Sequence, residues 1–96
     1  MQPIPLNVET MALAENLVWF EPPTAALADP VRFLAYAFAR ATHEQMKVLR
    51  TYVSGDDLLE ALDKAPPGII DPRSWAYWNG RMGRVPVPPL PKRRLE

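Results

Sequence analysis

Cysteine is absent from the 96-residue chain, so disulfide bonds and metal sites built on thiolates are excluded. Histidine occurs once, at His43, and no other strong nitrogen or sulfur ligand is available to join it in a metal site. No glycine-rich phosphate loop is present, and neither Ser54 nor Ser74 has a base near it in the sequence. We therefore predict no metal, no cofactor and no catalytic residues, and we expect that the chain is not an enzyme.

Long hydrophobic runs are also missing, because no stretch approaches the ~20 apolar residues that a membrane helix requires. No lysine or arginine precedes Arg32, so the amino terminus lacks the charged start of a secretory signal. These absences lead us to expect a soluble, cytoplasmic protein without membrane contact. A chain of this length also has a thin core, which leaves little room for a deep substrate cleft.

Proline, with twelve residues against four glycines, marks where helices begin and end. Asp29-Pro30 and Asp71-Pro72 are typical helix starts. In each pair the aspartate caps the free amides of the first turn, and the proline has no amide to lose. These two pairs predict helices over residues 30–41 and 72–82.

Two further segments have the spacing of a capping box, in which two polar side chains three residues apart satisfy the amides of a helix start. These segments are residues 42–45 and 54–57, and the helices they predict cover residues 43–53 and about 55–65. Thr10 is a candidate cap for another helix, over residues 11–20. No segment alternates as a strand does. We therefore predict an all-α fold, a small bundle of four or five short helices with extended, proline-rich termini.

A single helical domain is predicted over residues 10–83. Residues 1–9 are expected to form a flexible lead-in, because they carry two prolines and no helical periodicity. Residues 84–94 are expected to form a proline-rich basic tail or a strap. Residues 95–96 look like residues left by an expression vector, and we expect them to have no part in the function.

Helical periodicity assigns residues to an inner or an outer face of each helix. The predicted core consists of Leu34, Phe38, Met46, Leu49, Val53, Leu58, Leu62, Trp75, Trp78 and Met82. Inward stripes are also predicted over Val31, Leu34, Phe38 and Ala41, and over Leu13, Leu17 and Phe20. The residues predicted to face outward include Arg32, Tyr36, Arg40, His43, Lys47 and Arg50.

Charge is distributed unevenly along the chain, although its total is zero. Residues 1–71 contain five Lys/Arg and ten Asp/Glu, whereas residues 72–94 contain six Lys/Arg and no acid. The chain is therefore an acidic body with a basic tail, a polarity that bears on its partners more than on its fold.

The helix predicted over residues 72–82 has two different faces. The indoles of Trp75 and Trp78 share one side, and the opposite side is formed by Arg73, Tyr77, Arg81 and Arg84. Two interpretations of the cationic side remain open. It is either a solvated face, with guanidinium groups lying along the tyrosine, or a platform for an anionic partner.

The tail contains a second candidate interaction motif. Pro88-Pro89-Leu90-Pro91-Lys92-Arg93 has the P-x-x-P-x-R spacing, in which a polyproline helix presents two ridges and a cation to an aromatic groove. In the alternative, Val85, Val87 and Leu90 strap back over the helices, against the tryptophans. Contact between this basic tail and the acidic helix of another copy would produce self-association.

These patterns favour a non-enzymatic helical module that binds an unidentified protein partner through its last helix and its tail. The predicted partner-binding residues are Arg73, Tyr77, Arg81, Arg84, Pro88, Leu90, Pro91, Lys92 and Arg93. Two alternatives stay open: a weak, sequence-independent nucleic-acid-binding protein that uses the same cations, and a helical accessory subunit of an enzyme encoded elsewhere. The helix after Ser54 is not predicted to read DNA, because it carries four carboxylates and one lysine.

Overall fold

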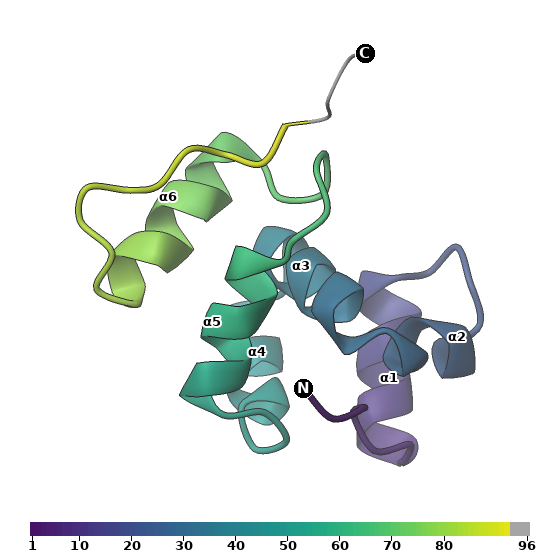
Figure 1. The fold of residues 1–96 in the computed structure, drawn as a ribbon. Coiled ribbons are helices and arrows are strands. Elements are labelled where there is room, and N and C mark those ends of the chain that lie inside the picture. The colour runs from purple at the N-terminus through teal and green to yellow at the C-terminus, as the bar shows by residue number, and fades with distance from the viewer. Residues whose placement is uncertain (93–96) are drawn as a thin grey trace.

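Six helices form the regular structure of residues 1–92, which are the residues that the computed structural model describes (Figure 1). They are α1 (Val8–Leu17), α2 (Pro23–Ala28), α3 (Pro30–Arg40), α4 (His43–Leu49), α5 (Gly55–Asp63) and α6 (Pro72–Arg81). No strand occurs in this part of the chain, so the predicted all-α fold is confirmed. None of these helices combines the length and the apolar character needed to cross a bilayer.

The helix starts predicted at Asp29 and Asp71 are confirmed, because each aspartate side chain accepts a hydrogen bond from the backbone amide three residues later. Both predicted capping boxes are also present, before α4 and before α5. Helix α4 ends at Leu49 rather than at residue 53, because the chain turns there. The amides of Thr51 and Tyr52 bond to carbonyls three residues back, as in a tight turn.

The first helix differs from its prediction at both ends. Its cap is Asn7, whose side chain accepts a hydrogen bond from the amide of Thr10, so Thr10 lies inside the helix instead of capping it. The Thr10 hydroxyl is buried and donates to the carbonyl of Pro5 at 2.6 Å. The helix ends at the buried Leu17, so Phe20 falls beyond it and is 45% exposed instead of sharing the buried face.

Two segments near the amino terminus are more ordered than the sequence indicates. Ile4, inside the predicted lead-in, is 3% exposed and belongs to the core. The sequence does not predict α2, because Pro22-Pro23 by itself indicates a helix stop. Pro23 instead occupies the first turn of a new helix, where its missing amide has no cost, and Leu27 of that helix is buried.

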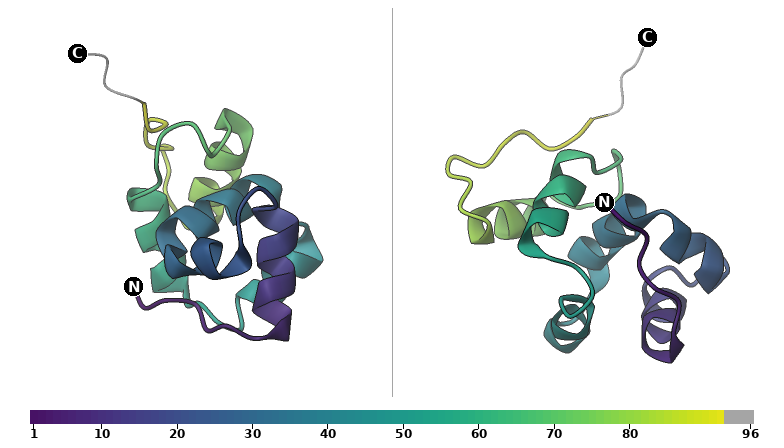
Figure 2. Two further views of the ribbon diagram at one scale, coloured as in Figure 1. Left: turned by 90° about the vertical axis from the view of Figure 1, so that its right-hand side faces the viewer. Right: turned by 60° about the horizontal axis from the view of Figure 1, so that its bottom comes forward.

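Helix α3 lies at the centre of the fold, where it contacts α1, α2, α5 and α6 (Figures 1 and 2). Its buried surface is therefore wider than the predicted single stripe. The buried residues of α3 are Phe33, Leu34, Ala35, Ala37 and Phe38. The two ends of the predicted stripe, Val31 and Ala41, are partly exposed.

The core extends from α3 to the other helices. Of the residues predicted to form it, those that are buried are Leu34, Phe38, Met46, Leu49, Val53, Leu58, Leu62 and Trp75. Trp78 and Met82 are partly buried and pack against its edge. The two indoles of α6 therefore have different environments, and Trp78 lies at the boundary between the core and the surface.

The chain reverses after α6 at Gly83, whose φ of +82° lies in the left-handed region that favours glycine. Residues 85–91, which we call the strap, then run back along α6 (Figure 1). The indole Nε1 of Trp75 donates to the carbonyl of Pro88 at 2.7 Å, and Leu90 packs partly buried against the core. Both valines of the strap are exposed. The segment is therefore held on the domain rather than extended as a free polyproline ligand.

Candidate functional site

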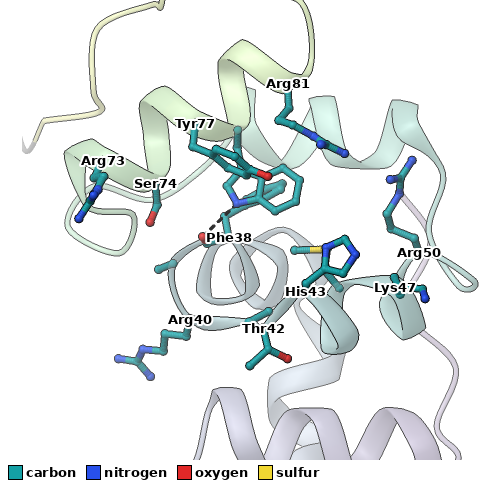
Figure 3. A pocket seen from close by; sticks show the side chains of 14 residues that line it. Phe38, Arg40, Thr42, His43, Lys47, Arg50, Arg73, Ser74, Tyr77 and Arg81 are labelled. Atoms are coloured by element: carbon teal, nitrogen blue, oxygen red, sulfur yellow. Dashed lines mark hydrogen bonds between the residues drawn. The ribbon is translucent and has the colours of Figure 1, made fainter.

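A cleft of about 390 Å³ lies between α6 and the junction of α3 with α4 (Figure 3). Its apolar surface includes Phe38, Met46 and Trp78, one residue from each of the three helices. Its cationic lining consists of Arg40, Lys47, Arg50, Arg73 and Arg81, together with His43. No aspartate or glutamate is among the described residues that line it. We call it the basic cleft.

Trp78 fixes the position of α6 against the end of α3. Its indole Nε1 donates to the carbonyl of Phe38 at 3.2 Å, and the two ring centroids are 5.2 Å apart. The hydrogen bond satisfies the one polar atom of a largely buried indole. Because residues 38 and 78 are held together in this way, the side chains around them on α6 face the start of α4 across the cleft.

Tyr77 provides an exposed aromatic surface beside this anchor. Its ring meets Trp78 edge-on, with centroids 5.3 Å apart, and its side chain remains 55% exposed. The Arg81 guanidinium lies 6.0 Å from the Tyr77 ring centroid, one helical turn further along α6. The cleft therefore presents a flat ring next to a cation, an arrangement suited to an apolar group that carries negative charge nearby.

Arg40 lines the basic cleft but is engaged elsewhere. Its guanidinium donates to the carbonyl of Leu17 at 3.0 Å and lies 4.8 Å from the Tyr36 ring centroid. Arg32 lies over the same ring at 5.2 Å, and its hydrogen bond to Glu21 raises the pKa of its guanidinium. The Arg32, Tyr36 and Arg40 side chains therefore form a cation–π cluster at the end of α1. Of the three, only Arg40 reaches the cleft.

The remaining four cations of the cleft differ from Arg32, Lys64 and Arg84, which lie elsewhere on the domain. Outside the cleft, Arg32, Lys64 and Arg84 each form an ion pair with a carboxylate. None of the five Lys/Arg side chains of the cleft forms such a pair within residues 1–92, and Arg40 instead donates to the carbonyl of Leu17. The four that remain are Lys47, Arg50, Arg73 and Arg81. Figure 3 shows Arg50 and Arg81 extending toward one another across one end of the cleft. Positive charge without a counter-charge is therefore concentrated at this site.

The structure separates the residues predicted for the cationic face of the last helix. Arg73, Tyr77 and Arg81 line the basic cleft. Arg84 does not belong with them, because it follows the end of α6 and forms a two-point ion pair with Asp63, at 2.5 and 3.0 Å. The hydrogen bonds from Arg84 lower the pKa of the Asp63 carboxyl below its ordinary value. Helical periodicity does not extend to Arg84, because α6 ends at Arg81.

The tail residues predicted to bind a partner are also distributed differently. Pro88 and Leu90 contact the domain through the Trp75 hydrogen bond and the core. Pro91 is partly exposed and Lys92 is exposed, at the end of the described residues. Arg93 lies outside the described residues. The acidic helix proposed for self-association uses Asp63 within the same chain, for the ion pair with Arg84.

Sequence reasoning does not assign the α4 wall of the cleft to the site. His43, Lys47 and Arg50 are predicted to face outward, and they do so, but the sequence gives no sign that this face lies opposite α6. The signal available is the row of cations at residues 43, 47 and 50, which are spaced three to four residues apart as on one helical face.

Comparison of the chain with protein-family models, with curated proteins and with solved structures finds no match in any of the three. The function is therefore inferred from the chemistry of the basic cleft.

Proposed function

We propose that the protein is a non-enzymatic interaction module that binds an acidic segment of a protein partner in the basic cleft. The observation that carries this proposal is the set of five cleft cations, none of which has a carboxylate partner in residues 1–92, beside an aromatic surface. Exposed charges that lack an internal partner are available to pair with a binding partner.

The aromatic surface supports a protein ligand. Tryptophan, tyrosine and arginine are the residues most enriched among those that dominate binding energy at protein interfaces. Here Trp78, Tyr77 and Arg81 occur next to one another on α6. A cleft of about 390 Å³ has the size of a pocket for a few side chains. A short segment with acidic residues beside an apolar one fits both the charge and the dimensions.

A protein partner is favoured over nucleic acid by the charge of the whole chain. Lysine and arginine balance aspartate and glutamate at eleven each, and the sequence pI is about 6.6. Domains that bind nucleic acid through phosphate contacts are typically strongly basic, because those contacts supply most of their affinity. The acidic α5 adds repulsion toward a long polyanion, whereas a short acidic peptide confined to the cleft avoids it.

The experiment is a fluorescence-anisotropy titration of the full chain with a labelled peptide that alternates acidic and apolar residues. A second peptide, with glutamine and asparagine in place of the acids, controls for apolar binding. The acidic peptide is expected to bind more tightly, and its affinity is expected to fall as salt is added. Equal affinity for the two peptides would overturn the proposal.

Two lysines provide matched variants for this titration. Lys47 lines the cleft, whereas Lys64 lies on the surface outside it, 3.8 Å from Glu60, and both are exposed. Lys47→Gln is expected to weaken binding of the acidic peptide by about two- to fivefold, the range of an exposed charge pair, and Lys64→Gln to leave it unchanged. Single-stranded DNA of the same charge serves as competitor. Tighter binding of the DNA than of the peptide would favour the nucleic-acid alternative instead.

A further inference from the structure

Two arginines from different helices converge at one end of the basic cleft. Arg50 caps the end of α4, Arg81 is the last residue of α6, and their side chains extend toward one another (Figure 3). His43, at the start of α4, also lines the cleft. No carboxylate within residues 1–92 forms an ion pair with either guanidinium. Because like charges repel, an anion bound between the two arginines lowers the energy of this arrangement.

Helix dipoles account for part of this placement. A positive charge near the carboxyl end of a helix interacts favourably with the helix dipole, and both arginines occupy such an end. That interaction does not require the two side chains to point toward each other across a shared cleft. Arg84 provides a comparison, because it also follows the end of α6 and is paired with Asp63. Arg50 and Arg81 therefore retain a capacity for binding an anion that Arg84 lacks.

We propose that Arg50, Arg81 and His43 form a subsite for a phosphate monoester, carried by a phosphorylated serine or threonine in the partner's acidic segment. This inference rests on the proposed function, because the rest of the cleft holds the remainder of the segment. A phosphate monoester carries a charge of about −1.5 to −2 near pH 7 and has three acceptor oxygens. Two guanidinium groups and an imidazole N–H match that charge and those oxygens better than they match one carboxylate.

The position of the subsite next to the aromatic surface defines the ligand further. The Arg81 guanidinium lies 6.0 Å from the centroid of the exposed Tyr77 ring. A phosphate bound at Arg81 therefore places the neighbouring residue of the segment over this ring, where an apolar side chain loses contact with water. A phosphopeptide makes both contacts, whereas free phosphate makes one. We expect the phosphopeptide to bind more tightly than inorganic phosphate.

The test uses three peptides that differ at one position, which is serine, glutamate or phosphoserine in an otherwise identical acidic sequence. The phosphoserine peptide is expected to bind the full chain at least about tenfold more tightly than the glutamate peptide, as charge-assisted hydrogen bonds to arginine allow. Arg50→Gln and Arg81→Gln are each expected to remove this preference, and Lys64→Gln to retain it. Equal affinity for the phosphoserine and glutamate peptides, or a preference that survives both arginine substitutions, overturns the subsite.

A titration with inorganic phosphate alone shows whether the subsite or the proposed function is wrong. In an NMR titration of the isotope-labelled full chain, phosphate is expected to shift the side-chain Nε–H signals of Arg50 and Arg81 and to leave that of Arg84 unchanged. These shifts without binding of any peptide would support the subsite and refute the proposed function. Peptide binding without these shifts, or an equal shift at Arg84, would overturn the subsite while the proposed function stands.

Discussion

The indole of Trp75 donates a hydrogen bond to the carbonyl of Pro88, with an Nε1–O distance of 2.7 Å, and so joins the buried side of α6 to the strap. Trp75 is 6% exposed, so the acceptor it uses must come from the protein itself. The strap supplies that acceptor, and its Leu90 adds apolar contact with the core. The proline-rich segment is therefore part of the folded domain at least as far as Leu90.

Trp75→Phe tests this contact, because it removes the hydrogen-bond donor and keeps an aromatic ring in the core. We expect it to lower the free energy of unfolding by about 1 kcal/mol or more, the typical contribution of one hydrogen bond. We also expect residues 85–91 to become more mobile, as measured by backbone NMR relaxation. Trp78→Phe is the control, because its indole bonds to Phe38 and not to the strap. Equal strap mobility in both variants would show that this hydrogen bond does not hold the strap.

Shortening a side chain to alanine is expected to change the free energy of unfolding very differently on the two sides of α6. Trp75→Ala removes a buried aromatic side chain and is expected to destabilise the protein by about 3 to 5 kcal/mol. Arg73→Ala, on the exposed cleft side, is expected to change the free energy of unfolding by no more than about 0.5 kcal/mol. Urea unfolding of both variants measures the difference. Similar unfolding midpoints would contradict the assignment of Trp75 to the core.

Much of this fold follows from signals that act within a few residues. Each of the caps at Asp29, Thr42, Ser54 and Asp71 binds an amide only three residues away, so its partner is visible in the sequence. The first helix is harder to predict, because its cap is Asn7, three residues before the predicted Thr10, and the two side chains form a reciprocal pair. The sequence does not show which of two polar residues is buried, and burial of Thr10 decides the outcome.

The basic cleft, in contrast, could be predicted only in part. Periodicity places Arg73, Tyr77 and Arg81 on one exposed face of α6, and it places Lys47 and Arg50 on an exposed face of α4. That these two faces meet depends on contacts between residues far apart in the chain. The Trp78–Phe38 hydrogen bond, which holds α6 against the end of α3, spans forty residues. No local pattern reports such a contact.

Acidification is expected to weaken the Asp63–Arg84 ion pair. The pKa of Asp63 is lowered in the folded protein by its hydrogen bonds to Arg84, so the carboxylate stabilises the fold at pH values above its ordinary pKa of 3.8. This contribution is lost as the pH falls through the lowered pKa. Because both side chains are partly exposed, solvent screening limits the effect to about 1 kcal/mol or less.

Arg84→Met measures the contribution of this pair, since it removes the charge and keeps most of the side chain's apolar length. The difference in unfolding free energy between wild type and variant is expected to be largest near pH 7 and to shrink as the pH falls below the ordinary pKa of 3.8 and through the lowered pKa of Asp63. Urea unfolding at several pH values gives both curves. A difference that stays constant across this range would show that Arg84 stabilises the fold through packing rather than through the charge of Asp63.

The last prediction concerns Asn79, whose side-chain amide is fully buried and has one atom without a hydrogen-bond partner. Its Nδ2 donates to the carbonyl of Trp75 at 2.9 Å, but its Oδ1 accepts no hydrogen bond from the described residues. An unsatisfied buried acceptor is unfavourable by about 1 to 3 kcal/mol, so Asn79→Leu is expected to leave stability nearly unchanged or to increase it. Asn79→Asp, of the same shape, is expected to cost about 3 kcal/mol or more near pH 7, because it places an unpaired carboxylate in the core. Thermal unfolding of the two variants measures both changes in stability. Strong destabilisation by Asn79→Leu would mean that Oδ1 has a partner that stabilises the native fold.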